Sequence, residues 1–249
     1  MKRESSVPYR VLPGSPPELV VYDEPQPCPY LAGYVARLPL RIPARPLTRS
    51  ELEQRLAAGD RRQGIFLYHT NCPACRACEP IRLNVAEFSA GRSQRRTLAQ
   101  GNRLLRTELG PALVDERRIE LYNRHKQMRG LGSGRAPIDF DGYREFLVLS
   151  SCETFELRYS LGEELLGVAL VDRSENALSA VYCYYDPSYA RLGIGTYSIL
   201  KQLELCREWG LGYLYLGLYI EGSEHMRYKS RFLPHERLLG GTWVRFEST

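Results

Sequence analysis

The sequence lacks any apolar run of membrane-spanning length, and no apolar segment follows Met1-Lys2-Arg3. A membrane helix needs about 20 consecutive apolar residues, and a secretory signal needs an apolar core after its basic start. The sequence also lacks internal repeats and low-complexity segments. We therefore expect a cytoplasmic globular protein that has no membrane partner.

Cysteine is sparse and odd in number, with seven in 249 residues. Without a secretion signal, an odd cysteine count argues against a disulfide framework and favours free thiols or a metal centre.

Neither charge sign is in large excess, because 34 Lys and Arg against 29 Asp and Glu give a net charge of +5. This mildly basic balance is compatible with a polyanionic partner and does not identify one.

The N-terminal third predicts a small α+β module over residues 1–90. The stretch up to Arg45 is rich in proline and is expected to be irregular. Thr48 and Glu51 form the pattern of a capping box, which predicts a helix that ends near Gly59. Strands are expected over 64–70 and 81–85, joined by a cysteine-bearing loop.

The remainder, 91–249, predicts an acetyltransferase-like (GNAT-like) mixed-sheet domain with a basic helical lead-in. Apolar periodicity predicts helices and strands in the following order: helices over 93–106 and 116–127, strands over 154–159, 165–171 and 178–184, a helix over 196–209 and a strand over 213–219. A strand meander followed by a helix after a glycine turn is typical of that fold. The fold class is therefore α+β.

The most informative segment contains Tyr182-Cys183-Tyr184-Tyr185-Asp186-Pro187 and, further on, His225-Met226-Arg227-Tyr228-Lys229. Gly193 and Gly195 precede a helix, and backbone N–H groups at such a turn can hold anions; a plain tight turn is the simpler alternative. Because side chains alternate along a strand, Tyr182 and Tyr184 should share the face that meets substrate.

Long segments of the chain resemble the aminoacyl-tRNA–protein transferases of the N-degron pathway. The segments are VYCYYDPSYARLGIGTYSILKQLELC, YLYLGLYIEGSEHMRYKSRF and LTRSELEQRLAAGDRRQGIFLYHTNCPACRACEPIRL, with SQRR after the last. The compact chain is most similar to the bacterial leucyltransferase branch of this arginyltransferase-like family.

The resemblance implies an enzyme that moves leucine from leucyl-tRNA to the α-amine of proteins with N-terminal Asp or Glu. The alternative within the family is an arginyl-tRNA–protein transferase with the same acceptors. The partners would be aminoacyl-tRNA and acidic N-termini, with no DNA, and the transfer itself would require no cofactor. A leucine donor needs an apolar pocket, for which Leu216, Leu218 and Ile220 are candidates.

Roles for the site residues follow from the chemistry of ester aminolysis. Asp186 is a candidate to accept a proton from the amine, although Asp before Pro is equally typical of a turn. His225 and Tyr228 are candidates for proton transfer. Lys229 is expected to pair with the acidic side chain of the acceptor, assisted by Arg231 or Arg158; a surface ammonium is the alternative for Lys229.

Cys72, Cys75 and Cys78 form CxxCxxC, and Cys28 offers a fourth thiol. Such spacing lets thiolates converge on zinc or an iron–sulfur cluster, and the resemblance supports a metal here. A loop of reduced thiols is the alternative. Another function for a thiol would be a nucleophilic pair of Cys183 with a histidine. The reaction that the resemblance implies needs no such enzyme nucleophile.

The arginines Arg92, Arg95, Arg96, Arg103 and Arg106 recur at about helical spacing. Such a stripe can bind an RNA backbone, or it can be an ordinary solvated helix face. With the resemblance, we expect the first four to contact tRNA. Two other functions remain open at this point: a small-molecule N-acyltransferase that uses acetyl-CoA, and a non-catalytic metal-bearing RNA-binding module.

Overall fold

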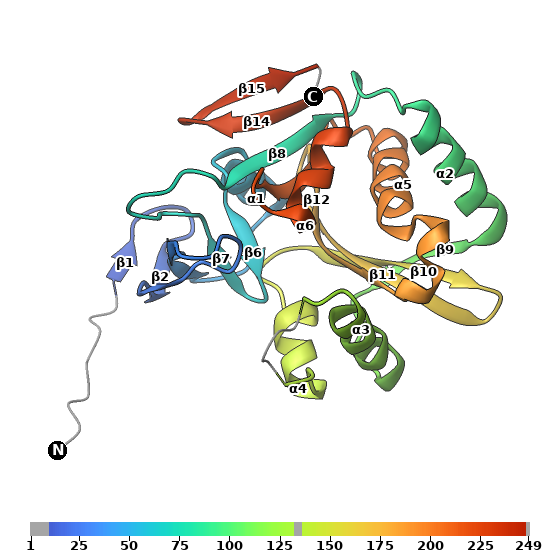
Figure 1. Ribbon diagram of the computed structural model, residues 1–249. Helices are drawn as coiled ribbons and strands as arrows, with labels where there is room; N and C mark the ends of the chain where they lie inside the picture. Colours follow the sequence, from blue (N-terminus) through green and yellow to red (C-terminus); the bar gives the residue numbers. More distant parts are fainter. Residues whose placement is uncertain (1–9, 132–135, 248–249) are drawn as a thin grey trace.

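The computed structural model describes residues 10–131 and 136–247 (Figure 1). A five-stranded sheet in the order β1-β2-β5-β7-β6 forms the N-terminal part. Its strands are β1 (Arg10–Leu12), β2 (Glu18–Tyr22), β5 (Leu40–Pro43), β6 (Arg61–Gln63) and β7 (Phe66–Tyr68), and β3 (Pro25–Pro27) pairs separately with β4 (Val35–Arg37). The expectation of an irregular start was wrong, because short strands accommodate proline where a strand edge needs no N–H donor.

Helix α1 (Arg49–Ala57) has the capping box that the sequence predicts. The Thr48 hydroxyl accepts a hydrogen bond from the Glu51 backbone N–H at 3.3 Å, and the Glu51 carboxylate accepts one from the Thr48 N–H at 2.8 Å. Leu52 and Leu56 are buried on the inner side of the helix. These contacts confirm the predicted start of the helix.

The second sheet has eight strands in the order β15-β14-β8-β13-β12-β11-β10-β9. The bounds are β8 (Glu79–Asn84), β9 (Arg106–Pro111), β10 (Thr154–Leu161), β11 (Glu164–Arg173), β12 (Ala177–Tyr185), β13 (Tyr213–Tyr219), β14 (His235–Leu239) and β15 (Thr242–Phe246). Only β12 and β13 run parallel; all other neighbouring pairs are antiparallel. The α+β class with a small N-terminal sheet and a larger mixed sheet is confirmed.

Strand β8 lies inside the large sheet, between β13 and β14, and not beside β7. Its Ile81 and Leu83 are fully buried, so the strand pairs where both of its edges and its apolar side chains are covered. The hairpin of β14 and β15 was not predicted, because its residues are mostly half-exposed and show weak alternation. The predicted domain boundary at residue 90 therefore follows a strand that belongs to the large sheet.

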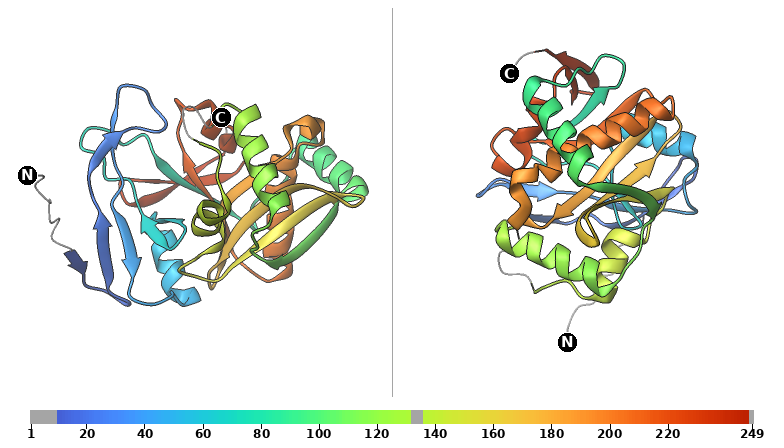
Figure 2. Two further views of the ribbon diagram at one scale, coloured as in Figure 1. Left: turned by 90° about the horizontal axis from the view of Figure 1, so that it is seen from below. Right: turned by 90° about the vertical axis from the view of Figure 1, so that its right-hand side faces the viewer.

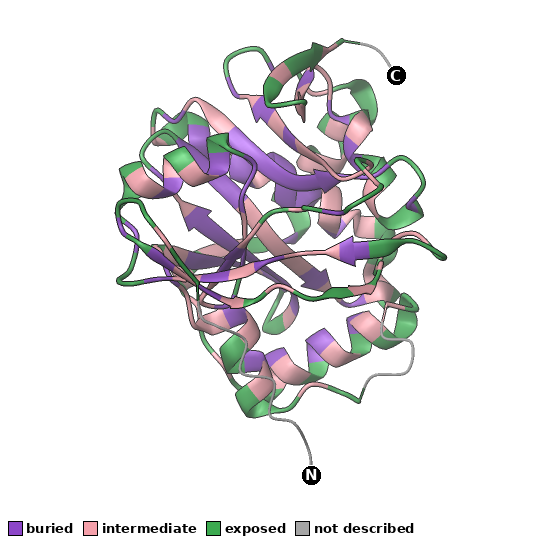
Figure 3. Cartoon of the chain, turned by 90° about the vertical axis from the view of Figure 1, so that its left-hand side faces the viewer, coloured by how far each residue is buried: buried purple, intermediate pink, exposed green. Residues whose placement is uncertain are grey.

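Helices cover both faces of the large sheet (Figures 1 and 2). Helices α2 (Arg92–Leu104) and α5 (Ile194–Glu208) pack on one face, where Leu203 and Cys206 of α5 join the largest core cluster. On the other face lie α3 (Glu116–Met128), α4 (Phe140–Tyr143) and a π-helical turn (Arg144–Val148). Figure 3 shows that the buried residues concentrate in the strands between these layers.

The remaining short elements follow the two central strands. They are the 3₁₀ segment η2 (Pro187–Leu192), the short helix α6 (Glu224–Arg227) and the 3₁₀ turn η3 (Tyr228–Arg231). Among the described residues, every helix is too short or too polar to traverse a bilayer.

The parallel strands β12 and β13 pair only at their beginnings. Their backbone register joins Ala177 with Tyr213 and ends where Ser179 meets Tyr215. Beyond this point β12 continues to Tyr185 and β13 to Tyr219 without pairing to each other. We call this divergence the fork. It opens at the carboxyl ends of two parallel strands, where ligands commonly bind in α/β sheets.

Candidate active site

A cavity of about 850 Å³ opens at the fork. It is lined by residues from both diverging strands, from the first three turns of α5, from α3, from the segment that contains α6 and η3, and from β6 of the N-terminal sheet. This volume lies within the range of pockets that hold small organic ligands. The cavity brings together Tyr182, Gly193, Gly195, His225, Tyr228 and Lys229, as the sequence analysis expected of one site.

The α5 helix begins at the wall of the cavity. Gly193 precedes the helix with φ of +64°, a left-handed conformation that favours glycine. An added Cβ at Gly193 would lie 3.0 Å from Thr97 of α2, so this turn is also closely packed. Gly193 and Gly195 both line the cavity, and the first turn of α5 contains no acidic residue. The positive end of a helix of 15 residues therefore faces the space in which substrate would lie.

Lys229 also lies in the wall of this cavity and is only 7% exposed. Its Nζ donates to the Leu218 carbonyl of β13 at 2.6 Å and contacts the Met226 sulfur at 3.3 Å. No ion pair joins it to a carboxylate within residues 10–131 and 136–247. Burial, and then the charge of Arg61, lower the pKa of Lys229 to about 7. Lys229 is therefore buried, and the alternative that its ammonium lies at the surface is wrong.

His225 and Tyr228 flank Lys229 at the cavity edge. His225 is exposed, and Tyr228 is 39% exposed. The pKa of the Tyr228 phenol is nevertheless raised, mainly because burial of its hydroxyl disfavours the charged form. The phenol is therefore neutral at physiological pH and can donate a hydrogen bond into the cavity.

Tyr182 and Tyr184 share one face of β12, with ring centroids 6.5 Å apart, as predicted. Only Tyr182 lines the cavity. The Tyr184 hydroxyl is hydrogen-bonded to that of Tyr143, and its side chain is fully buried in the core under α3. The structure therefore places Tyr184 away from substrate, because a one-face pattern cannot distinguish a cavity wall from a core position.

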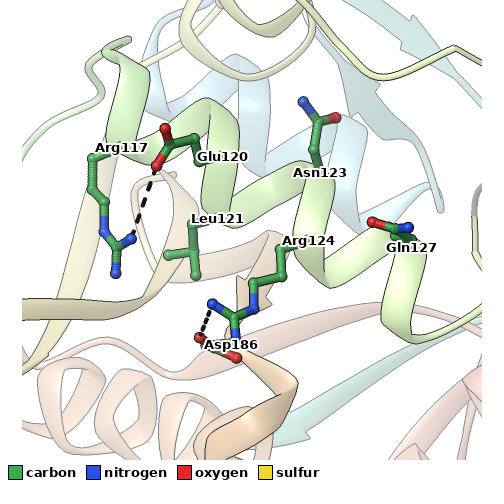
Figure 4. Close-up of a pocket in the computed structure, with 7 residues that line it drawn as sticks. All are labelled: Arg117, Glu120, Leu121, Asn123, Arg124, Gln127 and Asp186. Carbon is green, nitrogen blue, oxygen red and sulfur yellow. Dashed lines mark ion pairs between the residues drawn. The ribbon is translucent and has the colours of Figure 1, made fainter.

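Asp186 lies outside this cavity, in a separate groove along α3 (Figure 4). It is 1% exposed; its Oδ1 accepts the Ser188 backbone N–H at 2.9 Å, and its Oδ2 pairs with Arg124 at 3.1 Å. Both carboxylate oxygens are therefore occupied. The turn that Asp before Pro predicts is the role that the structure shows for Asp186, and we do not assign it a proton-transfer role.

Arg158 and Arg231 also lie outside the cavity. The Arg158 guanidinium packs against Gly110 of β9 and lies 3.9 Å from Glu156. Arg231 is exposed, and its backbone carbonyl accepts a hydrogen bond from the side chain of Gln94. The structure therefore does not bring Arg158 or Arg231 into the cavity wall that contains Lys229.

The arginines of the basic stretch lie on one exposed helix. Arg92, Arg95, Arg96 and Arg103 are all exposed on α2, while Gly101 of the same helix is buried against the ring of Tyr197 on α5. Thr97 of α2 touches the Gly193 turn. The exposed arginines therefore lie on the helix that packs beside the glycine turn of the cavity.

The four cysteines Cys28, Cys72, Cys75 and Cys78 come near each other. The pKa of Cys78 is raised to about 12, mainly by burial and then by Cys72, Cys28 and Cys75. However, no group of three or more His, Cys, Asp or Glu side chains in the described part of the chain has an arrangement that could hold a metal ion. The zinc or iron–sulfur candidate is therefore unsupported, and we derive no chemistry from it.

Several residues of the cavity were not assigned to this site from the sequence. His125 of α3 is 3% exposed, its Nδ1 lies 2.8 Å from the Tyr185 carbonyl, and burial lowers its pKa to about 4. Arg129 donates to the Tyr185 hydroxyl at 2.7 Å. Arg61 of β6 reaches the fork itself. No local motif marks these residues, because each reaches the cavity through long-range packing.

Comparison with known proteins gives a consistent result over most of the chain. The family profile "Arginine-tRNA-protein transferase, N terminus" matches residues 26–96, and "Arginine-tRNA-protein transferase, C terminus" matches residues 117–239. Aspartate/glutamate leucyltransferase from Chromobacterium violaceum is 37% identical over 88% of this chain and 90% of its own length. The enzyme of that name from Methylobacillus flagellatus is 38% identical over 87% of each chain.

A third relative and two solved structures extend the comparison. The aspartate/glutamate leucyltransferase of Gluconacetobacter diazotrophicus is 37% identical over 92% of this chain and 88% of its own. The structure of FemX aligns with 84% of this chain and 79% of its own at a TM-score of 0.44 and 9% identity. The C-terminal domain of a putative lysylphosphatidylglycerol synthetase from Agrobacterium fabrum covers 64% of this chain and 54% of that one at a TM-score of 0.45 and 13% identity.

Proposed function

The chain belongs to the arginine-tRNA-protein transferase family, and we propose that it moves leucine from leucyl-tRNA to the α-amine of proteins that begin with Asp or Glu. The added leucine would mark the acceptor for degradation. Because the donor is an aminoacyl-tRNA, the reaction takes place in the cytoplasm. The chemistry needs no cofactor, since the aminoacyl ester is already activated.

One observation carries this proposal: a buried ammonium, without a carboxylate partner among the described residues, lies in the wall of the same cavity as the start of a helix. Lys229 supplies the ammonium, and the first turn of α5 supplies backbone N–H groups. A buried cation that lacks a partner is costly unless an anion compensates it. The carboxylate of an N-terminal Asp or Glu would provide that anion.

The cavity wall favours leucine over arginine as the transferred residue. Leu216 and Leu218 line it, as expected for the leucyl side chain, whereas Ile220 is fully buried and lies outside it. Among the described residues, the exposed Glu224 is the only carboxylate in the lining. A guanidinium in this cavity would have no buried acid with which to pair.

The proposed reaction is aminolysis of the ester between leucine and the terminal ribose. The neutral amine attacks the carbonyl carbon, a C–N bond forms, the C–O bond to ribose breaks, and one proton passes from the amine to the leaving oxygen. N–H groups at the start of α5 stabilise the oxyanion in between. His225 and Tyr228 are the cavity-edge groups that can relay the proton, with the vicinal ribose hydroxyl as a further carrier.

The tRNA would reach the cavity over α2. Its exposed arginines, Arg92, Arg95, Arg96 and Arg103, lie on the helix that packs against α5 and touches the Gly193 turn. Guanidiniums at this position neutralise phosphates of the acceptor stem while the aminoacylated end enters the fork. The two substrates thus enter from different sides, the donor past α5 and the acceptor past η3.

A transfer assay with purified protein tests the proposal. Peptides beginning with Asp, Glu or Ala are supplied in turn with leucyl-tRNA, arginyl-tRNA and acetyl-CoA, and products are read by mass. We expect a gain of one leucine, on the Asp and Glu peptides only, with leucyl-tRNA only. A gain of arginine with arginyl-tRNA would show that the protein is an arginyl-tRNA–protein transferase. Acetylation, or no product from either tRNA with folded protein, would refute the proposal.

A further inference from the structure

Arg61 is the second cation of the fork, and it comes from the N-terminal sheet. Its Nη2 points to the Ala180 carbonyl of β12 at 3.5 Å, and its guanidinium packs against Gly217 of β13. Ala180 is the first residue of β12 beyond the last β12–β13 pair. Arg61 therefore sits at the point where the two strands separate.

The absence of a side chain at Gly217 makes this position available. An added Cβ there would lie 2.6 Å from Arg61 Nη1 and 2.7 Å from its Cζ. These distances are too short for a real contact, so only glycine lets the guanidinium rest on the backbone of β13. The φ of +87° at Gly217 also favours glycine.

Arg61 and Lys229 lie over consecutive residues of β13. Arg61 rests on Gly217, while Lys229 Nζ donates to the carbonyl of the next residue, Leu218. Consecutive Cα atoms are about 3.8 Å apart, so two positive groups converge on one small region of the cavity. The charge of Arg61 contributes to the lowered pKa of Lys229, in agreement with this proximity.

Neither cation is neutralised by the protein. No ion pair involves Arg61 or Lys229 within the two described ranges, and Arg61 Nη1 is buried without any hydrogen-bond partner. Arg62, the next residue, differs in this respect, because its Nε and Nη2 both donate to the carboxylate of Asp172. Burial and the charge of Arg61 favour the neutral form of Lys229, and a bound anion would restore its charge and compensate both groups.

We propose that Arg61 and Lys229 form one two-cation site for the side-chain carboxylate of the acceptor, with Arg61 as the specificity residue that the N-terminal sheet contributes. This inference rests on the proposed function. It means that the N-terminal sheet and the C-terminal part of the chain bind an acidic N-terminus together. Strand β6 supplies the planar guanidinium of Arg61, and η3 supplies the ammonium of Lys229. Arg61 acts on the acceptor and takes no part in binding tRNA.

The test compares peptides that begin with Asp and with the isosteric Asn. Arg61→Gln should raise the KM for the Asp peptide at least tenfold, leave the KM for leucyl-tRNA unchanged, and bring the Asp and Asn peptides closer together. Arg61→Lys should recover part of the Asp preference, because it keeps the positive charge but lacks the planar set of guanidinium donors. Arg10→Gln, which changes an exposed arginine of β1, is the matched control and should behave as wild type.

A merely structural Arg61 would lower kcat/KM for both peptides by the same factor, and that result would overturn the proposal, as would no change at all. Peptide binding without tRNA, followed by calorimetry, separates this inference from the proposed reaction. Wild type should bind the Asp peptide more tightly than the Asn peptide, and Arg61→Gln should lose that difference, even if no leucine is transferred. Equal binding of the two peptides by wild type would overturn the two-cation site.

Discussion

The guanidinium of Arg62 on β6 binds both carboxylate oxygens of Asp172 at the end of β11, at 2.7 and 2.9 Å. Each side chain is 2% exposed, so this bidentate pair ties the N-terminal sheet to the large sheet inside the protein. Because Arg61 precedes Arg62 on the same short strand, the pair also fixes where Arg61 enters the fork. The connection between the two sheets is therefore part of the active-site geometry.

Asp172→Asn should destabilise the protein strongly, because it leaves the Arg62 charge buried without a counter-charge. We expect the free energy of unfolding to fall by about 3 kcal/mol, measured by urea denaturation. Arg49→Gln breaks the exposed pair with Glu153 and serves as control; its urea midpoint should match that of wild type. Equal midpoints for all three proteins would show that the buried pair does not hold the sheets together.

The preference for Asp over Asn should weaken as pH rises through neutrality. With a pKa of about 7, Lys229 is an ammonium below pH 7 and loses its charge above it, so its attraction for a carboxylate is present at low pH and lost at high pH. The ratio of kcat/KM for the Asp and Asn peptides cancels titration of their α-amines. We expect this ratio to fall by about tenfold between pH 6 and 9.

In Lys229→Arg, the ratio of kcat/KM for the Asp and Asn peptides should no longer depend on pH, because a guanidinium keeps its charge at every pH tested. The other charged or titratable groups that line this cavity are Arg61, Arg62, Arg129, Lys126, His125, His225, Glu224, Cys183, Tyr30, Tyr68, Tyr182, Tyr185 and Tyr228. A ratio in the wild-type enzyme that does not change with pH would show that Lys229 does not bind the acceptor carboxylate.

Asp186 should behave as a structural residue. Asp186→Asn and Arg124→Gln each remove the same ion pair, so both should lower kcat by a similar factor, less than about tenfold, with an unchanged pH profile. Loss of a general base would instead cost about 10²-fold or more in Asp186→Asn alone. Steady-state kinetics of the two variants and their combination distinguishes these outcomes.

The exposed arginines of α2 should act on the donor only. In the double variant Arg95→Gln/Arg96→Gln, the KM for leucyl-tRNA should rise. The slope of the logarithm of tRNA affinity against the logarithm of salt concentration should become shallower by roughly 0.7 to 0.9 for each phosphate contact that is lost. The KM for the Asp peptide should stay at the wild-type value. Unchanged salt dependence would indicate that tRNA binds elsewhere on the protein.

Local patterns predicted the elements whose contacts are local. The capping box of Thr48 and Glu51 is complete within four residues, and the apolar runs of β10 to β12 match strands that are largely buried. The glycine turn at Gly193 and the segment around Lys229 were likewise recognised, because the first opens a helix after a strand and the second combines an imidazole, a phenol and an ammonium within five residues. In the structure both segments line the same cavity.

Features that depend on long-range pairing could not be read in this way. Nothing near Arg61 in the sequence shows that it rests on Gly217, and nothing near Asp186 shows that Arg124 occupies one of its oxygens. Strand β8 joins the large sheet because β13 and β14 offer it partners on both sides, which only the complete fold reveals. Arg158 and Arg231, which the sequence placed beside Lys229, lie outside the cavity, whereas Arg61 lines it.

The most direct measurement is the ratio of kcat/KM for Asp and Asn peptides in the wild-type enzyme with saturating leucyl-tRNA at pH 7. The two peptides have the same shape and differ in one charge, so the ratio reports recognition of the carboxylate alone. We expect the Asp peptide to be preferred at least a hundredfold, because two unpaired cations face its side chain. Leucine transfer to both peptides at equal rates would contradict the central claim.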